Sequence, residues 1–198
     1  MRKRLTINPV RNGALRVVQV TDTHIAREPG PTDFEGVDTG ATLRTVLDAV
    51  AGLSPAPDCI LLTGDLVDIP SPEAYARVLE LFGGCTCPVV SLPGNHDDPV
   101  MMRTMLNAGC MSTHSVIDAG HWRIVLLNDY LPRSDGGRLP DHELEFLSHE
   151  LHRDDTEHVL VCLHHQPVPV GSPWMDAMGL DDPDVLFAVI DADRKSVV

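Results

Sequence analysis

Short apolar runs rich in β-branched residues recur along this 198-residue chain, and most of them end in side chains that can bind a metal ion. Runs of this kind are typical of strands that are buried on both faces. Because such strands must be covered on both sides, they restrict the chain to a layered fold. The predicted strands are Leu15–Val20, Cys59–Leu62, Pro88–Leu92, Trp122–Leu127 and Val159–Leu163.

Between these strands lie segments whose apolar residues recur at three- and four-residue spacing, which predicts helices. The alternation of strands and helices favours an α/β domain with mainly parallel pairing in its first half. Residues Ser115–Leu127 instead predict two strands around a turn at Gly120, and so a hairpin or a mixed second sheet. The predicted helices are Thr42–Leu53, Pro72–Phe82, Pro99–Ala108 and Asp141–His152.

Size and charge narrow the class of protein. A chain of 198 residues can bury one substantial core, so we expect one domain over residues 1–198. The net charge of −14 disfavours a nucleic-acid polymer as partner. We find no secretory signal and no transmembrane segment, so no membrane is expected. Five cysteines, an odd number, suit reduced thiols and a cytoplasmic location. The sequence leaves the oligomeric state open.

Polar side chains follow four of the predicted strands at the point where each strand ends. In open α/β sheets, ligands bind beyond the carboxyl ends of the strands, where successive loops meet. We therefore expect these side chains to converge. Asp22 and His24 follow the first strand, Asp65 the second, Asn95 and His96 the third, and His164 and His165 the last.

The residue types at these strand ends indicate metal binding. Asp65 comes directly after Gly64 at a buried strand end, where an unpaired carboxylate is costly, whereas Asp68 also suits an exposed loop. Asn95 offers a neutral oxygen ligand, and the adjacent Asp97 can orient His96. Carboxylate, amide and imidazole together favour two divalent ions that share a carboxylate and clamp a phosphoryl group. This ligand set admits manganese, iron, cobalt or zinc.

The four motifs, in order, resemble those of the calcineurin-like metallophosphoesterases over residues 15 to about 180. They are Asp-x-His, Gly-Asp-x-x-Asp, Gly-Asn-His-Asp and His-His-x-Pro. The segments 19–24, 92–97 and 164–171 are most similar to bacterial class III cyclic-nucleotide phosphodiesterases. The resemblance implies a layered α/β fold with two mixed sheets flanked by helices. It also implies hydrolysis of 3′,5′-cyclic AMP, or a related cyclic nucleotide, to the 5′-monophosphate by a metal-bridged hydroxide, with iron or manganese as the expected metals.

The resemblance assigns roles to individual residues. One ion would be bound by Asp22, His24 and Asp65, and the other by the shared Asp65 with Asn95 and His164. His96 would act in catalysis at the phosphate and the leaving oxygen, oriented by Asp97. The side chains expected to face the substrate are those of His24, Asn95, His96 and His165.

The sequence departs from the family pattern in one respect. The family completes its site with a Gly-His-x-His motif, whereas no histidine follows His165 here. The resemblance therefore implies that the last part of the domain is missing and that each ion lacks one imidazole, with the residues after Asp191 leading into the next strand. Two alternatives remain: a glycerophosphodiester or generic phosphodiester hydrolase, and a catalytically inactive metal-binding remnant.

Overall fold

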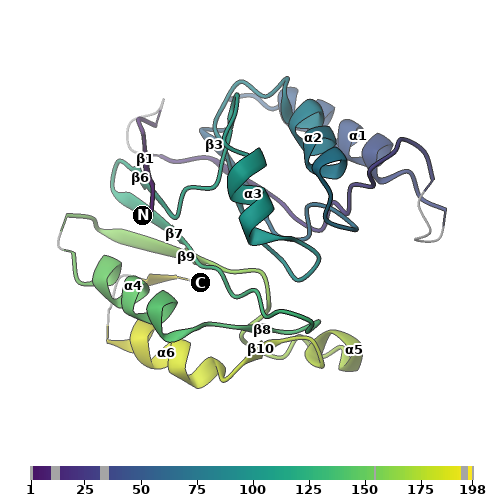
Figure 1. The fold of residues 1–198 in the computed structure, drawn as a ribbon. Helices are drawn as coiled ribbons and strands as arrows, with labels where there is room; N and C mark the ends of the chain where they lie inside the picture. The colour runs from purple at the N-terminus through teal and green to yellow at the C-terminus, as the bar shows by residue number, and fades with distance from the viewer. Residues whose placement is uncertain (1, 10–13, 32–35, 154, 193–195, 198) are drawn as a thin grey trace.

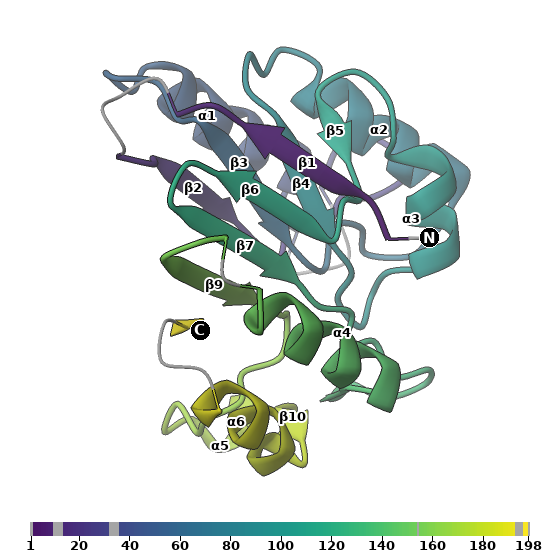
Figure 2. The same ribbon diagram turned by 90° about the vertical axis from the view of Figure 1, so that its left-hand side faces the viewer.

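Two β-sheets packed face to face form the centre of the computed structural model, which describes residues 2–9, 14–31, 36–153, 155–192 and 196–197 (Figures 1 and 2). Within these ranges one sheet has the order β2-β3-β4-β5 and is parallel throughout. We call it the parallel sheet. Its strands are β2 (Val17–Val20), β3 (Cys59–Thr63), β4 (Val89–Leu92) and β5 (Met111–Ser112).

The second sheet, called the mixed sheet, has the order β1-β6-β7-β9-β11 in the described part of the chain. Only the β6–β7 pair is antiparallel, and it is the hairpin predicted around Gly120, whose φ is +62°. The sequence did not predict the first strand of this sheet, because the segment is short and basic. The strands are β1 (Arg4–Ile7), β6 (Val116–Ala119), β7 (Trp122–Leu126), β9 (His158–Cys162) and β11 (Ser196–Val197).

The predicted α/β class is confirmed, with one refinement. Two mixed sheets were expected, and the first is parallel throughout its described strands because the connections after β2, β3 and β4 run through helices before the chain returns to the sheet. All four predicted helices are present within a few residues of their expected ends. They are α1 (Thr39–Ala51), α2 (Pro72–Phe82), α3 (Pro99–Met105) and α4 (Asp141–Leu151).

Helices cover both outer faces of the sheet pair. Helices α1, α2 and α3 lie on the parallel sheet, and α4 and α6 (Pro183–Asp191) lie on the mixed sheet (Figure 1). Strand β3 shows how the layers form, because its side chains alternate between two apolar clusters. Cys59 and Leu61 pack between the sheets, whereas Ile60 and Leu62 pack under the helices.

The remaining elements lie after β7. Strands β8 (Gly137–Arg138) and β10 (Leu180–Asp181) form a small parallel pair, and helix α5 (Pro173–Asp176) precedes β10 in the sequence and lies beside the pair (Figure 1). The strand expected after Asp191 is β11, which pairs with β9, although residues 193–195 and 198 lie outside the described ranges. No helix in those ranges is long and apolar enough to cross a membrane.

A buried arginine joins the mixed sheet to helix α4. Arg123 on β7 is 1% exposed, and its Nε lies 2.8 Å from Asp118 Oδ1 and 3.5 Å from Glu150 Oε2. Arg4 on β1 lies against the same two carboxylates, at 2.6 and 2.7 Å. Because charges removed from water need close partners, this network fixes the edge strand and the helix relative to the sheet.

We expect Arg123→Ala to lower the free energy of unfolding by about 3–5 kcal/mol, because it removes a buried cation from between Asp118 and Glu150. Urea unfolding followed by circular dichroism measures the change. Arg44→Ala is the control, because Arg44 is exposed on α1, away from this network, and its loss should shift the midpoint much less. Equal shifts in the two variants would contradict the role given to Arg123.

Candidate metal centre

The loops after β2 and β3 run side by side beyond the ends of the two strands. The N–H groups of Asp22, His24 and Ile25 donate to the carbonyls of Gly64, Asp65 and Leu66 at 3.1, 3.0 and 2.9 Å. An isolated parallel bridge between Ile25 and Val67 extends the pairing. The first two motifs are therefore held in fixed register by the backbone, which is what brings their side chains together.

Three residues of these loops have a left-handed backbone, which is uncommon for side chains other than glycine. The φ angles are +54° at Asp22, +40° at His24 and +52° at Asp65. Such conformations persist only where surrounding bonds fix them, and they concentrate at functional sites. Here the paired loops supply those bonds. The strain turns each strand end so that its metal-binding group faces the same space.

Asp65 lies at the centre of this space. Its side chain is 6% exposed, and Oδ2 is 3.6 Å from His24 Nε2 and 3.5 Å from His164 Nε2. Its other oxygen, Oδ1, accepts a hydrogen bond of 2.9 Å from the backbone N–H of His96. Asp22 lies further out, with Oδ1 4.0 Å from His24 Nε2. One carboxylate thus lies between two imidazoles that come from different sheets.

His164 follows β9 and reaches across to the end of β3. Its Nδ1 lies 2.9 Å from the carbonyl oxygen of Thr63, so Nδ1 carries the proton and donates. Nε2 is then left as the ring nitrogen that faces Asp65. A backbone carbonyl that fixes the tautomer in this way is the usual support of a metal-binding histidine. The preference for His164 over His165 as the ligand agrees with this geometry.

His96 is positioned in the same manner. Its Nδ1 lies 2.9 Å from the carbonyl oxygen of Asp68, so Nδ1–H donates and Nε2 remains available. The His96 ring packs edge-on against the ring of His24, with centroids 4.7 Å apart. Asn95 precedes His96 in the loop between β4 and α3. The predicted residues Asp22, His24, Asp65 and His96 therefore meet at one edge of the parallel sheet.

The prediction that Asp97 orients the His96 ring is wrong. Asp97 does not contact the His96 ring, because both of its carboxylate oxygens bond elsewhere. Oδ2 accepts from the N–H groups of Leu66 and Gly94 at 3.1 and 3.0 Å, and Oδ1 accepts from the Tyr75 hydroxyl at 3.1 Å. With 2% exposure, Asp97 cannot touch a substrate. It fixes the β4–α3 loop to the loop after β3, so it positions the residues of the site from the buried side of these loops.

The substrate-facing role predicted for His165 also fails. His165 is 4% exposed, and its Nδ1 lies 3.1 Å from Oδ2 of Asp129, which is fully buried. Its Nε2 lies 3.2 Å from the carbonyl oxygen of Asp135. Both ring nitrogens are thus occupied inside the protein. The ring packs edge-on against His164 at 4.8 Å between centroids, and in this way it supports the His164 imidazole.

Burial and neighbouring polar groups shift the pKa values of the residues at the centre in opposite directions. Burial lowers the pKa of His164, but the hydrogen bond and charge of Asp65 outweigh it and raise that pKa to about 9. Burial likewise raises the pKa of Asp65, but the contact with His164 leaves it below its usual value. Burial raises the pKa of Asp97 to about 6 against the hydrogen bonds from Gly94 and Leu66. The protein alone therefore balances a buried carboxylate with imidazolium charge, which a bound cation would replace.

The donor groups fit divalent metal ions. Asp22, Asp65 and His164 place one ligand atom each within 4.8 Å of one another, and so do His24, Asp68 and His96. Carboxylate oxygen and imidazole nitrogen are ligands of manganese, iron, cobalt and zinc. The position of Asp65 between His24 and His164 agrees with the shared ligand that the sequence predicted.

Comparison with known proteins also points to a phosphoesterase. The family model for calcineurin-like phosphoesterases matches residues 15–189. The chain belongs to the calcineurin-like phosphoesterase family. It is 34% identical to the 3′,5′-cyclic adenosine monophosphate phosphodiesterase of Pseudomonas aeruginosa over 92% of this chain and 66% of that protein. For the enzyme of the same name from Escherichia coli K12, the identity is 32% over 96% and 69%.

A cyanobacterial relative extends the comparison. The 3′,5′-cyclic-nucleotide phosphodiesterase of a Nostoc species is 32% identical over 89% of this chain and 66% of that protein. The chain thus spans about two thirds of the length of each of these relatives.

Two supporting residues of this phosphoesterase site were not predicted. Asp68, the second carboxylate of Gly-Asp-x-x-Asp, lies within reach of His24 and His96, although it equally suited an exposed loop in the sequence. Asp129 binds both the N–H and the ring of His165. Its position in a polar pair directly after β7 was the only available signal. Strand-end position identifies such residues only when the partner strand is also known.

Gly94→Ala is expected to weaken Mn²⁺ binding by about 10- to 100-fold. A Cβ at this position would lie 2.2 Å from Asp65 Oδ1 and 2.8 Å from His164 Nε2, so the ligands must move. Isothermal titration calorimetry measures the affinity. Gly84→Ala is the matched control, because a Cβ there meets nothing within 4 Å. An unchanged affinity in Gly94→Ala would show that Asp65 and His164 do not bind the metal.

Proposed function

We propose that this chain carries the catalytic site of a metal-dependent phosphodiesterase that hydrolyses 3′,5′-cyclic AMP, or a related cyclic nucleotide, to the 5′-monophosphate. The observation that carries the proposal is the Asp65 carboxylate, which lies between His24 and His164 with one oxygen about equally far from both rings. Phosphodiester hydrolysis needs positive charge on both sides of such a group. The substrate class follows from the names of the relatives, which act on cyclic nucleotides.

The proposed ligands divide between two ions. Asp22, His24 and Asp65 hold one, and Asp65, Asn95 and His164 hold the other. Manganese or iron fits these groups, as do cobalt and zinc. Bound there, the ions would neutralise phosphate oxygens and lower the pKa of a water molecule at the site. We also propose that residues 1–198 belong to one domain. The free thiols favour a cytoplasmic location, where thiols stay reduced.

The protein side chains would orient the substrate and move the proton. His96 donates from Nδ1 to the carbonyl of Asp68, so its Nε2 can carry a proton to the departing ester oxygen. The contact between the His24 and His96 rings keeps that nitrogen beside the metal ligands. Asp97 and Tyr75 hold the loop in place from the buried side. Each group therefore has one role in binding, orientation or proton transfer.

The Mn²⁺-loaded protein is expected to convert 3′,5′-cyclic AMP to 5′-AMP faster than it hydrolyses a glycerophosphodiester, as measured by chromatography of the products. Asp65→Asn should reduce the rate at least about 100-fold, because it weakens the ligand that both ions share. Asp48→Asn, an exposed carboxylate on α1, is the matched control. Metal binding without turnover would contradict the proposal and favour an inactive metal-binding remnant, whereas a preference for the glycerophosphodiester would favour a different hydrolase.

His96→Asn should lower kcat by about 10²- to 10⁴-fold, the usual contribution of a general acid. The metal content should stay unchanged if the ring acts on the leaving oxygen rather than as a ligand. Steady-state kinetics with metal analysis separates the two roles. A substrate with an activated leaving group, which needs no proton, should lose much less rate in this variant. Loss of metal, or equal losses on both substrates, would contradict general-acid catalysis by His96.

A further inference from the structure

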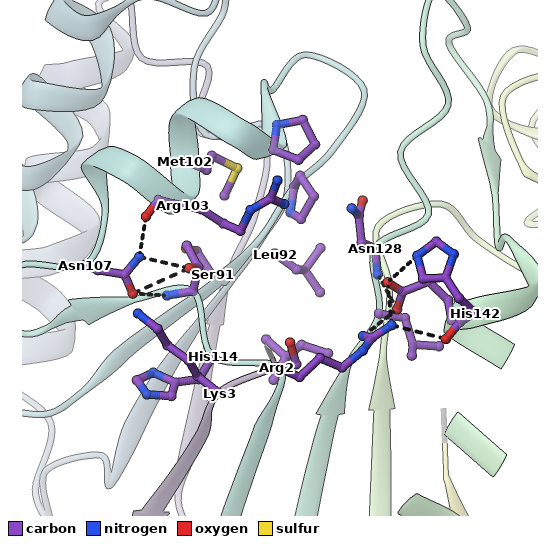
Figure 3. Close-up of a pocket in the computed structure, with 17 residues that line it drawn as sticks. Arg2, Lys3, Ser91, Leu92, Met102, Arg103, Asn107, His114, Asn128 and His142 are labelled. Atoms are coloured by element: carbon purple, nitrogen blue, oxygen red, sulfur yellow. Dashed lines mark hydrogen bonds and ion pairs between the residues drawn. The ribbon is translucent and has the colours of Figure 1, made fainter. Parts of the chain in front are cut away.

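A second concave site lies on the other side of the β4–α3 segment from the metal centre. It is a cavity of about 400 Å³, which lies within the size range of small-molecule sites. Its walls come from the segment before β1, the ends of β4 and β7, helix α3, the β5–β6 loop and the start of α4 (Figure 3). None of the metal-binding side chains lines it. We call it the α3 cleft.

The α3 cleft is cationic, although the whole chain carries a charge of −14. Arg2, Lys3 and Arg103 line it, against the single carboxylate of Glu143. Glu143 is already engaged, because its Oε1 lies 2.9 Å from Arg2 Nη2 and its Oε2 accepts from the N–H of Asn128. Arg2 also stacks on the ring of Phe146 at 3.7 Å. One arginine and the carboxylate therefore satisfy each other at the α4 end.

The remaining cations have no such partner. In the described part of the chain, no hydrogen bond or ion pair involves the side chains of Lys3 and Arg103. Figure 3 shows Arg103 extending from α3 into the middle of the cleft, opposite the wall that carries Lys3. His114 lies beside Lys3 (Figure 3), and its Nδ1 is buried and has no partner among the described residues. A buried polar atom without a partner is uncommon, so His114 adds an unsatisfied polar group to the wall of the cleft.

The floor of the α3 cleft is apolar. Leu92, Met102, Leu126 and Leu127 are each at most 4% exposed and lie beneath the cationic groups. Asn107 stands at the edge, where its amide bonds to Thr113 at 3.0 Å and fixes the β5–β6 loop next to His114. A ligand that consisted of an anionic group alone would contact the cationic side chains but leave the apolar floor uncovered. The combination suits a ligand with a phosphate at one end and a flat apolar body at the other.

We propose that the α3 cleft binds a small phosphate monoester of the mononucleotide class. Lys3 and Arg103 hold the phosphate, with His114 as a further donor, and the base lies on the floor of leucine and methionine side chains. Arginine binds phosphate through two parallel hydrogen bonds and lysine through its compact charge, so both are suited to this role. The assignment is independent of the proposed diesterase activity, because it uses no residue of the metal centre.

Calorimetric titration of the metal-free Asp65→Asn protein with 5′-AMP tests the proposal, since EDTA and that substitution remove the competing metal site. Saturable binding at one site is expected, and adenosine, which lacks the phosphate, should bind at least about tenfold more weakly. Backbone amide shifts in NMR spectra locate the ligand. They should change at Thr113–Ser115 and stay unchanged at Leu163–His165.

Charge variants complete the test. In the same background, Lys3→Ala and Arg103→Ala should each weaken 5′-AMP binding by about tenfold or more, because a charge-assisted hydrogen bond is lost. Both side chains are exposed, so the fold should persist. Arg44→Ala removes an exposed arginine on α1 and should leave the affinity unchanged. Absent binding, binding that neither variant weakens, or equal affinity for adenosine would each overturn the proposal.

Discussion

The buried carboxylate of Asp65 is the group on which the arrangement of the whole site depends. It sits on a left-handed backbone between two imidazoles and accepts a hydrogen bond from a third motif through the N–H of His96. Gly64 and Gly94 are needed around it, because a Cβ at either position would collide with His164 or with Asp65 itself. A charge at such a place requires opposite charge nearby. The protein part of the site therefore favours the binding of cations.

The fold supplies the rigidity that this arrangement needs. Backbone pairing beyond β2 and β3 holds Asp22, His24 and Asp65 in register, and Asp97 with Tyr75 fixes the third loop from below. His164 must come from the other sheet, so the distance between the sheets also matters. The apolar layer between the sheets and the buried Arg123 network set the mixed sheet in place. Groups far from the chemistry thus position one imidazole.

The sequence predicted that four of the proposed ligands would lie together, because polar groups at the ends of neighbouring strands reach the same end of the fold. Asp22, His24, Asp65 and His164 all follow that rule. The roles predicted for Asp97 and His165 were wrong, because adjacency along the chain says nothing about which side of a loop a side chain occupies. The partners of Arg123 were equally hidden, since they come from β6 and α4. Contacts between distant segments require the tertiary structure.

The proposed chemistry requires that one carboxylate, that of Asp65, is shared by two metal ions. Electron paramagnetic resonance of the Mn²⁺-loaded protein tests it most directly, because two Mn²⁺ ions joined by a common ligand couple magnetically. We predict a coupled spectrum for the unsubstituted protein, and loss of the coupling in Asp65→Asn. A spectrum of isolated Mn²⁺ ions at full metal loading, or a coupled spectrum that survives Asp65→Asn, would contradict it.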